Sequence, residues 1–351
     1  MPSTPLMRMI DAAVNRAGEG LRVVEDFTRF VLDDPHLTRL AKALRHNFAE
    51  AAAMVAASDR HTARDTQYDV GTLISAVSEG ERADAWAVCV AGLKRAQQSL
   101  RSLEEYGKLS DGKFADEIQR IRYRLYTLEK AIDTERTSRE WLEGVRLCVL
   151  VDGGTSTAEF ERLVTALVEA GVGMIQLRDK QLADRELAAR ARLLRQLTRE
   201  KPTLAIINDR ADIAAAVHAD GVHLGQDDLT VKDARTIIGT RMLVGVSTHT
   251  IDQARTAALD GANYLGAGPT FPSRTKSFDL FAGLDLLRAV AAEIRLPTFA
   301  IGGIDSDNLA GVLATGVGRV AVGAAVTAAS DPGRVARKLV EALRLPASPS
   351  R

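Results

Sequence analysis

Several features are scarce or absent in this chain of 351 residues, and each absence excludes a class of protein. Its two cysteines, Cys89 and Cys148, lie in apolar runs, so we expect reduced core residues and no disulfide framework. No apolar stretch reaches the length of a membrane span, and residues 1–11 lack the apolar core of a signal peptide. These absences predict a cytoplasmic protein.

An excess of charge of one sign is also missing. The chain has 46 basic and 46 acidic residues and an isoelectric point of about 7.0. Nothing in this balance attracts nucleic acid or a membrane surface, so we expect small-molecule substrates and neither of those partners. A homo-oligomer is compatible with the sequence. The length exceeds that of one compact core and predicts two domains.

Residues 1–137 lack a convincing strand pattern and read as helices. Apolar residues recur there at intervals of three and four, which is the seam spacing of packed helices. Two such seams are Ile10, Val14, Ala17, Leu21 and Val24, and Ile118, Ile121, Leu125, Leu128 and Ile132. We predict an all-α helical bundle of four or more helices for this domain.

The first domain also contains an internal echo. Arg16, Leu21-Arg22 and Glu25 recur 79 residues later as Arg95, Leu100-Arg101 and Glu104. A duplicated helical hairpin explains the echo, although a shared helix pattern alone can imitate one. Gly18 and Gly20 interrupt the first of these helices. We expect close helix packing there, and a backbone approached by a ligand is the alternative.

A change of rhythm follows a charged segment, and we place a linker at residues 138–144. Short apolar runs then alternate with amphipathic segments, which predicts repeated βα units and a closed (β/α)8 TIM barrel at residues 145–345. A doubly wound open sheet is the alternative. Residues 346–351 form a tail. The predicted strands are residues 145–151, 173–177, 203–207, 221–224, 243–246, 263–266, 297–301 and 319–322.

Polar residues gather where these strands end, which is where a barrel carries its chemistry. Gln176, Arg178 and Lys180 alternate at the end of the second strand, so we expect them to face the barrel mouth together. Two cations there require an anion, since an unpaired charge in a desolvated place is costly. Asn208 and Asp209 end the third strand, and Asp228 follows the fourth.

Carboxylates on neighbouring strand ends suit a magnesium ion, which prefers one or two carboxylates with water and phosphate oxygens. Helix capping by Asp209 and Asp228 is the alternative, but their pairing beside Arg178 and Lys180 favours the metal. Ser247 is either a phosphate donor or an N-cap. His223, inside a strand, is expected in the core or behind the site, and His249 is expected to be structural.

The sixth strand is followed by a loop too long for a simple connector, at residues 266–276. Its hydroxyls, its lysine and its glycine and proline hinges suit a lid over an anionic substrate. Gly302 and Gly303 end the seventh strand, and Gly323 and Ala324 end the eighth. Backbone N–H groups at these positions form the recurrent phosphate site of such barrels.

These motifs resemble those of the thiamine-phosphate synthases, over residues 145–343. The shared patterns are Gln-Leu-Arg-x-Lys, Asn-Asp-Arg, His-Leu-Gly-Gln-x-Asp, Gly-Val-Ser and a Gly-x-x-Phe-Pro loop that closes in Thr-Lys. The resemblance implies a transferase of thiamine biosynthesis that joins a pyrimidine diphosphate to a thiazole monophosphate and releases pyrophosphate. It assigns the pyrimidine diphosphate to Gln176, Arg178, Lys180, Asn208, Ser247 and Lys276, magnesium to Asp209 and Asp228, and the thiazole phosphate to Ser273, Thr275, Gly303, Gly323 and Ala324. Arg178, Lys180 and Lys276 would be catalytic.

Two positions depart from the family pattern. Threonine usually stands where this chain has Ser273, which keeps the hydroxyl. Val-Ser usually stands where this chain has Gly323-Ala324, which loses one, so we expect altered thiazole affinity and retained activity. A thiazole-isomerising barrel and a ligand-binding regulator remain alternative functions.

The first domain resembles a helical domain that is fused ahead of such synthases and linked by name to hydroxymethylpyrimidine phosphate kinases. The matching stretches are residues 15–26, 64–66 and 100–106. The domain has no Gly-x-x-x-x-Gly-Lys-Ser/Thr loop or other nucleotide cradle, so the residues themselves do not predict a kinase.

Overall fold

The computed structural model describes residues 3–65, 67, 81–272 and 282–344. The chain divides into two compact units, Met1–Asp133 and Thr134–Arg351, each of which is described by itself. No helix in the described part of the chain is long and apolar enough to cross a membrane.

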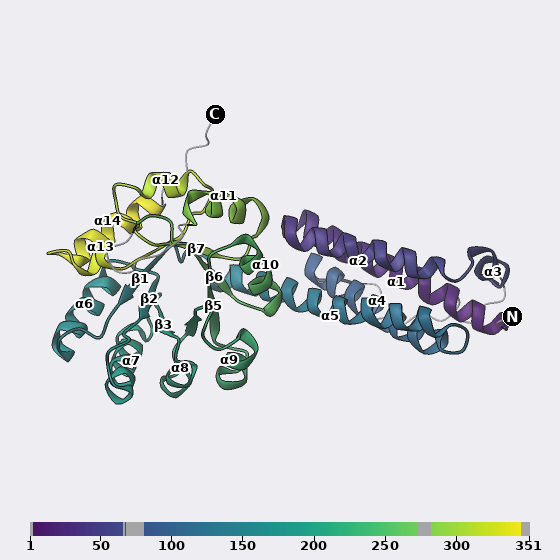
Figure 1. Ribbon diagram of the computed structural model, residues 1–351, viewed down its shortest axis with the longest axis horizontal. Helices are drawn as coiled ribbons and strands as arrows, with labels where there is room; N and C mark the ends of the chain where they lie inside the picture. Colours follow the sequence, from purple (N-terminus) through teal and green to yellow (C-terminus); the bar gives the residue numbers. More distant parts are fainter. Residues whose placement is uncertain (1–2, 66, 68–80, 273–281, 345–351) are drawn as a thin grey trace. The chain divides into compact units, whose positions relative to one another are not determined.

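The first unit is helical, as predicted. Long helices run alongside one another in it (Figure 1). Asp34 and Asp84 cap two of them, accepting hydrogen bonds from Leu37 N at 2.6 Å and Ala87 N at 2.7 Å. The unit contains α1 (Thr4–Phe30), α2 (Pro35–Ala53), α3 (Ala57–Thr62), α4 (Ala85–Gly107) and most of α5 (Gly112–Trp141).

The two interior glycines of α1 have different surroundings. A Cβ on Gly20 would lie 2.5 Å from the carbonyl oxygen of Gly92 in α4, so the predicted close packing is confirmed there. A Cβ on Gly18 would meet nothing nearer than Phe48 Cε1, at 3.8 Å. The same prediction is wrong for Gly18, because no helix backbone approaches it.

The duplication predicted from the sequence has a structural counterpart. Arg45 Nε donates to Glu25 Oε2 at 2.5 Å, and Arg122 Nε donates to Glu104 Oε2 at 2.8 Å. Glu104 follows Glu25 by 79 residues, and Arg122 follows Arg45 by 77. An equivalent, largely buried ion pair therefore joins α1 to α2 and α4 to α5.

The second unit is the predicted (β/α)8 barrel. Its strands are all parallel and close in sequential order, β1 pairing with both β2 and β8. The strands are β1 (Leu147–Val151), β2 (Met174–Leu177), β3 (Leu204–Asn208), β4 (Gly221–Leu224), β5 (Leu243–Thr248), β6 (Tyr264–Ala267), β7 (Thr298–Ile301) and β8 (Val320–Val322). Each agrees with its predicted range within about two residues.

Helices cover the outside of this barrel (Figure 1). They are α6 (Thr157–Glu169), α7 (Asp184–Thr198), α8 (Ala211–Val217), α9 (Val231–Ile238), α10 (Ile251–Asp260), α11 (Gly283–Glu293), α12 (Leu309–Leu313), α13 (Ala324–Thr327) and α14 (Pro332–Arg344). The outward strand residues and these helices form one apolar core, and a smaller cluster that includes Cys148, Met174, Ile206 and Phe299 fills the barrel interior. Alternate strand residues thus supply the two sets.

The segment predicted as a linker at residues 138–144 is structured differently. Helix α5 runs to Trp141, and the division between units falls at Asp133. Ser138 and Leu142 are fully buried, and Asn263 Nδ2 donates to Ser138 Oγ at 2.9 Å. The charged residues of this segment concealed its buried face, so the sequence suggested a connector where the barrel unit already begins.

Candidate active site

The end of β2 carries the cations that the sequence singled out. Gln176 lies within the strand and is 4% exposed, whereas Arg178 and Lys180 follow its last residue and are exposed. Asp179 holds their loop, since its carboxylate accepts hydrogen bonds from the backbone N–H groups of Gly153, Gln181 and Leu182. Although burial opposes the change, these donors lower the pKa of Asp179.

Two carboxylates meet one of these cations at the same rim. Lys180 Nζ lies 3.4 Å from Asp209 Oδ2, and the Asp209 and Asp228 side chains face each other within hydrogen-bonding reach. Asp209 follows β3 with a φ of 62°, and its N–H donates to the His223 carbonyl at 2.8 Å. The structure therefore brings Lys180, Asp209 and Asp228 together, as the parallel barrel predicted.

Electrostatics separate the two carboxyl groups. Burial, followed by the facing Asp228, raises the pKa of Asp209, and Lys180 only partly offsets this rise. Burial also acts upward on Asp228, but hydrogen bonds from Asp209 and from the Gly225 N–H outweigh it and lower the pKa of Asp228. Two acidic groups forced together in this way fit a bound cation, which would relieve their repulsion.

Helix capping, the alternative for three of these residues, does not occur. Helix α8 begins after Arg210 without a side-chain cap, and α9 and α10 are capped by Thr230 and Thr250. None of the three side chains, Asp209, Asp228 and Ser247, therefore caps any of the described helices. The described residues contain no cluster of three or more His, Cys, Asp or Glu that would hold a metal, so a cation here would take two carboxylates and further ligands from elsewhere.

A polar chain crosses the barrel interior beneath this rim. His223 Nε2 lies 2.9 Å from Ser247 Oγ, and His223 Nδ1 lies 3.3 Å from the Tyr264 hydroxyl, which also has the Gln176 side chain as a hydrogen-bond partner. Space for the rings depends on Gly245, where a Cβ would lie 2.1 Å from the Tyr264 ring. This series of hydrogen-bonded side chains links Gln176 on β2 to Ser247 on β5.

His223 is neutral in this setting. Burial is the largest cause that lowers its pKa to about 4; Arg178 acts in the same direction and Asp228 opposes it. The expected core position of His223 is confirmed, since it is 7% exposed. Tyr264 was not singled out in the sequence. Gln226, whose Nε2 donates to the Ser247 carbonyl at 2.5 Å, was likewise treated only as part of a motif.

His249 makes the structural contact expected of it. Its Nδ1 lies 2.6 Å from the carbonyl oxygen of Gly268, and its backbone N–H donates to Gln253 Oε1 at 2.7 Å. Asn208 is half-buried at the end of β3, and its backbone is paired in register with His223. In the described part of the chain, neither His249 nor Asn208 forms a hydrogen bond with the carboxylate of Asp209 or Asp228.

The glycines after β7 support the start of the loop that follows β6. Gly302 and Gly303 have φ values of 100° and 65°, and a Cβ on Gly303 would lie 2.6 Å from the Pro272 carbonyl oxygen. Close packing thus accounts for both glycines, apart from any phosphate. Gly323 and Ala324 lie at the start of α13, beyond the end of β8. Ser273, Thr275 and Lys276 lie outside the described residues, as does most of the predicted lid.

Comparisons with known proteins agree with the fold and the motifs. Residues 147–326 match the model of the family described as thiamine monophosphate synthase. The chain belongs to this family. Residues 8–131 match a second family model, ThiD2, which covers the helical unit. The family and the (β/α)8 fold expected from the sequence are confirmed, and with them the transferase class.

Two curated relatives match nearly the whole chain, and one solved structure matches part of it. The chain is 44% identical over 330 residues to the thiamine-phosphate synthase of Rhodopirellula baltica, covering 91% of this chain and 88% of the other. It is 36% identical to that of Synechocystis, over 97% of each chain. The solved thiamine phosphate pyrophosphorylase of Pyrococcus furiosus is 35% identical, with a TM-score of 0.51, over 57% of this chain and 98% of its own.

Proposed function

We propose that this protein condenses 4-amino-2-methyl-5-hydroxymethylpyrimidine diphosphate with thiazole monophosphate to form thiamine phosphate and pyrophosphate. The bond between the methylene carbon and the diphosphate oxygen breaks, and its electron pair leaves with the pyrophosphate. The aminopyrimidine ring stabilises the resulting cation, and the lone pair of the thiazole nitrogen forms the new carbon–nitrogen bond. No proton has to be removed for this bond, so the site needs no general base.

The protein's part is to position two substrates and neutralise the departing charge. Arg178 and Lys180 supply positive charge beside the leaving group, together with Lys276 from the loop after β6. Gln176, Asn208 and Ser247 orient the pyrimidine diphosphate. The Gln176–Tyr264–His223–Ser247 chain supports two of these groups from within the barrel. Ser273, Thr275, Gly303, Gly323 and Ala324 hold the thiazole phosphate.

Asp209 and Asp228 are the residues that would hold Mg²⁺. Their paired carboxylates and the raised pKa of Asp209 fit such an ion, because magnesium prefers few carboxylates and shares its remaining sites with water and phosphate. When bound, Mg²⁺ would stabilise negative charge on the pyrophosphate. The observation that carries the proposal is the meeting of Lys180, Asp209 and Asp228 at one rim.

The test measures thiamine phosphate and pyrophosphate after both substrates and Mg²⁺ are added to purified protein. Asp209→Asn should lower kcat by about two orders of magnitude or more, since it removes a carboxylate that would hold Mg²⁺ beside the leaving group. Asparagine tolerates the positive φ of this position, so folding should survive. Glu169→Gln makes the same chemical change at the far end of α6, on an exposed side chain, and should retain full turnover.

The same assay separates the alternatives. Rearranged thiazole without coupling would identify an isomerase, and binding without either product would identify a regulator. Undiminished turnover in Asp209→Asn would contradict the proposed site while leaving the reaction in place.

A further inference from the structure

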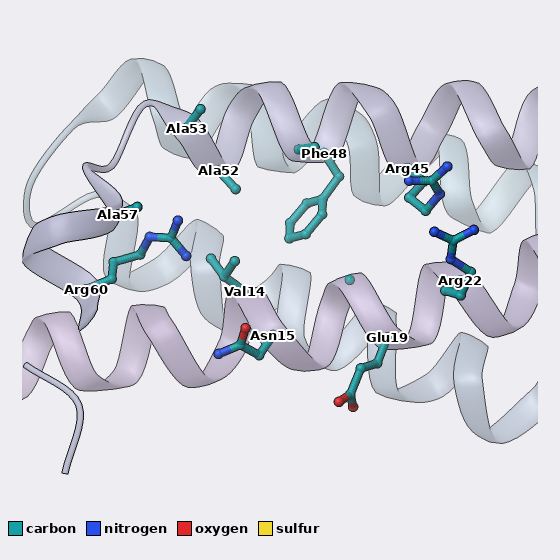
Figure 2. Close-up of a pocket in the computed structure, with 12 residues that line it drawn as sticks. Val14, Asn15, Glu19, Arg22, Arg45, Phe48, Ala52, Ala53, Ala57 and Arg60 are labelled. Carbon is teal, nitrogen blue, oxygen red and sulfur yellow. The ribbon is translucent and has the colours of Figure 1, made fainter. Parts of the chain in front are cut away.

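The helical unit contains a pocket that the proposed reaction does not use. It has a volume of about 550 Å³ and lies among α1, α2 and α3. Phe48 points into it from α2 between the helices, with Ala52 on the same helix and Val14 on α1 opposite (Figure 2). These side chains give the pocket a flat apolar surface.

Three guanidinium groups line the same pocket. Figure 2 shows Arg22 and Arg45 pointing toward each other at one end and Arg60 at the other. Arg45 is paired with Glu25 at 2.5 Å, and an Arg60 terminal nitrogen lies 3.9 Å from Asp11. Arg22 has no ion-pair or hydrogen-bond partner among the described residues, and Arg60 Nε is buried without one. Glu19 is the carboxylate on the lining itself, and it is exposed and lies 3.7 Å from Arg95.

The second half of the duplicated unit carries different side chains at the corresponding positions. Gly18 and Ala52 correspond to Gln97 and Glu129, at the same offsets of 79 and 77 residues that relate the Glu25–Arg45 and Glu104–Arg122 pairs. Gln97 Nε2 donates to Glu129 Oε2 at 2.6 Å, and Lys94 donates to Glu129 Oε1 at 2.9 Å. The second half thus has a hydrogen-bonded Gln–Glu pair where the first half has glycine and alanine. Its own cavity, of about 430 Å³, is lined by Trp86, Tyr126, Glu129, Lys130 and Asp133.

The cations differ between the halves in the same way. Arg101, which corresponds to Arg22, is paired with Glu104 at 2.6 Å and Glu105 at 2.7 Å. The first half therefore differs in having a guanidinium unpaired among the described residues, that of Arg22, which lines its pocket and faces Arg45. Of these two facing guanidinium groups, only that of Arg45 is paired with a carboxylate of the described chain, that of Glu25, so an added anion is favoured. Arginine side chains bind phosphate or carboxylate groups through paired hydrogen bonds.

We propose that this pocket binds a small organic anion, with a phosphate or carboxylate between Arg22 and Arg45 and a flat apolar body against Phe48. The site is separate from the barrel and independent of its reaction. Phosphate and carboxylate ligands share this chemistry, so the probes have to distinguish them.

Isothermal titration calorimetry on the full chain tests the proposal with phenyl phosphate, benzoate and inorganic phosphate. We expect phenyl phosphate or benzoate to bind more tightly than inorganic phosphate, because only they contact the apolar wall. Arg22→Gln should weaken binding by about tenfold or more, as the loss of a charge-assisted hydrogen bond requires. The double variant Gly18→Gln with Ala52→Glu places the Gln–Glu pair of the second half in this pocket, beside the arginines, and should abolish binding.

Two controls keep the result specific. Arg101→Gln removes the corresponding, internally paired guanidinium and should leave affinity unchanged. Arg178→Ala, made at the barrel rim, should also leave this affinity unchanged, which separates the pocket from the proposed active site. Four outcomes would each overturn the proposal. Two concern the variants: equal binding by Arg22→Gln and the parent, or equal losses of affinity in Arg22→Gln and Arg101→Gln. Two concern the probes: inorganic phosphate binding as tightly as both aromatic probes, or no binding of any probe at millimolar concentration.

Discussion

Single residues at the barrel rim derive their properties from their neighbours. Asp209 and Asp228 are both ordinary aspartates in the sequence, yet the structure moves their pKa values in opposite directions. The facing carboxylate is the second cause for Asp209, after burial. The split between the two groups is therefore a property of the pair, and each member is a probe of the other.

Asp228→Asn should consequently lower the pKa of Asp209 toward its ordinary value. The substitution removes the facing negative charge, which disfavours ionisation of Asp209, while burial remains. Carbon-13 NMR titration of the labelled Asp209 carboxyl in the Mg²⁺-free protein would measure the change. Glu169→Gln serves as the control and should leave the titration curve in place. An unchanged or higher pKa of Asp209 in Asp228→Asn would show that the two side chains do not interact.

His223 makes the folding stability depend on pH. Its pKa is lowered from about 6.5 in an unfolded chain to about 4 in the fold, where it faces Tyr264 with Arg178 and Asp228 nearby. The folded state thus binds a proton less readily than the unfolded state. The resulting stability is fully present above pH 6.5 and is lost as the pH falls toward 4, by about 3 kcal/mol.

Urea unfolding at pH 7 and pH 4.5 would measure this loss. His223→Gln keeps a polar side chain but cannot titrate, so its free energy of unfolding should fall less over the same interval. Both proteins share every other titrating group, which cancels in the comparison. Parallel losses in the two proteins would mean that His223 is not buried in neutral form.

Among the elements, the strands were predictable and the end of α5 was not. Apolar runs such as those in β1 and β5 are buried on both faces, so their sequence signal is strong. Ser138 and Leu142 are buried at the end of a helix whose other faces are charged, and only the folded barrel identifies their partners. The close contact of Gly303 with Pro272 could not be predicted from the sequence either, because a glycine pair is as compatible with phosphate binding as with close packing.

The candidate site was predictable in part for the same reason. Motifs at strand ends converge because parallel strands end at one rim, so the meeting of Lys180 with Asp209 and Asp228 followed from topology. The interior chain through Tyr264 depended on which strand residues face inward and on the space at Gly245. Those are properties of register and packing that a single sequence does not state.

The contact between α5 and the barrel strands should contribute measurably to stability. Ser138 Oγ accepts from Asn263 Nδ2, while Asn263 Oδ1 accepts from Val244 N at 2.9 Å and from Arg235. Ser138→Ala leaves the buried amide N–H without this acceptor and should cost about 1–3 kcal/mol. Chemical denaturation measures the loss, with Ser102→Ala as the control, a half-buried serine whose hydroxyl donates within α4. Equal stability of Ser138→Ala and the parent would contradict the contact.

The whole molecule joins a barrel to a helical unit, and the two are separable in principle. The Pyrococcus furiosus pyrophosphorylase covers 57% of this chain and 98% of its own, a share close to that of the barrel unit. A fragment of residues 134–351 should therefore fold cooperatively and keep kcat within a few fold when both substrates are supplied. It retains Ser138 and Leu142, and so the buried end of α5.

A fragment of residues 143–351 should fare worse, although it contains every strand of the barrel. It lacks Leu142, which is fully buried in the cluster at the barrel interior, and loss of such a side chain costs about 2–5 kcal/mol. Thermal unfolding of the two fragments and the full chain, followed by the condensation assay, would compare them directly. If the shorter fragment matched the longer one, the boundary would lie where the sequence suggested, at residues 138–144. If neither fragment were active while the full chain was, the helical unit would be required for catalysis, and the barrel's independence would be refuted.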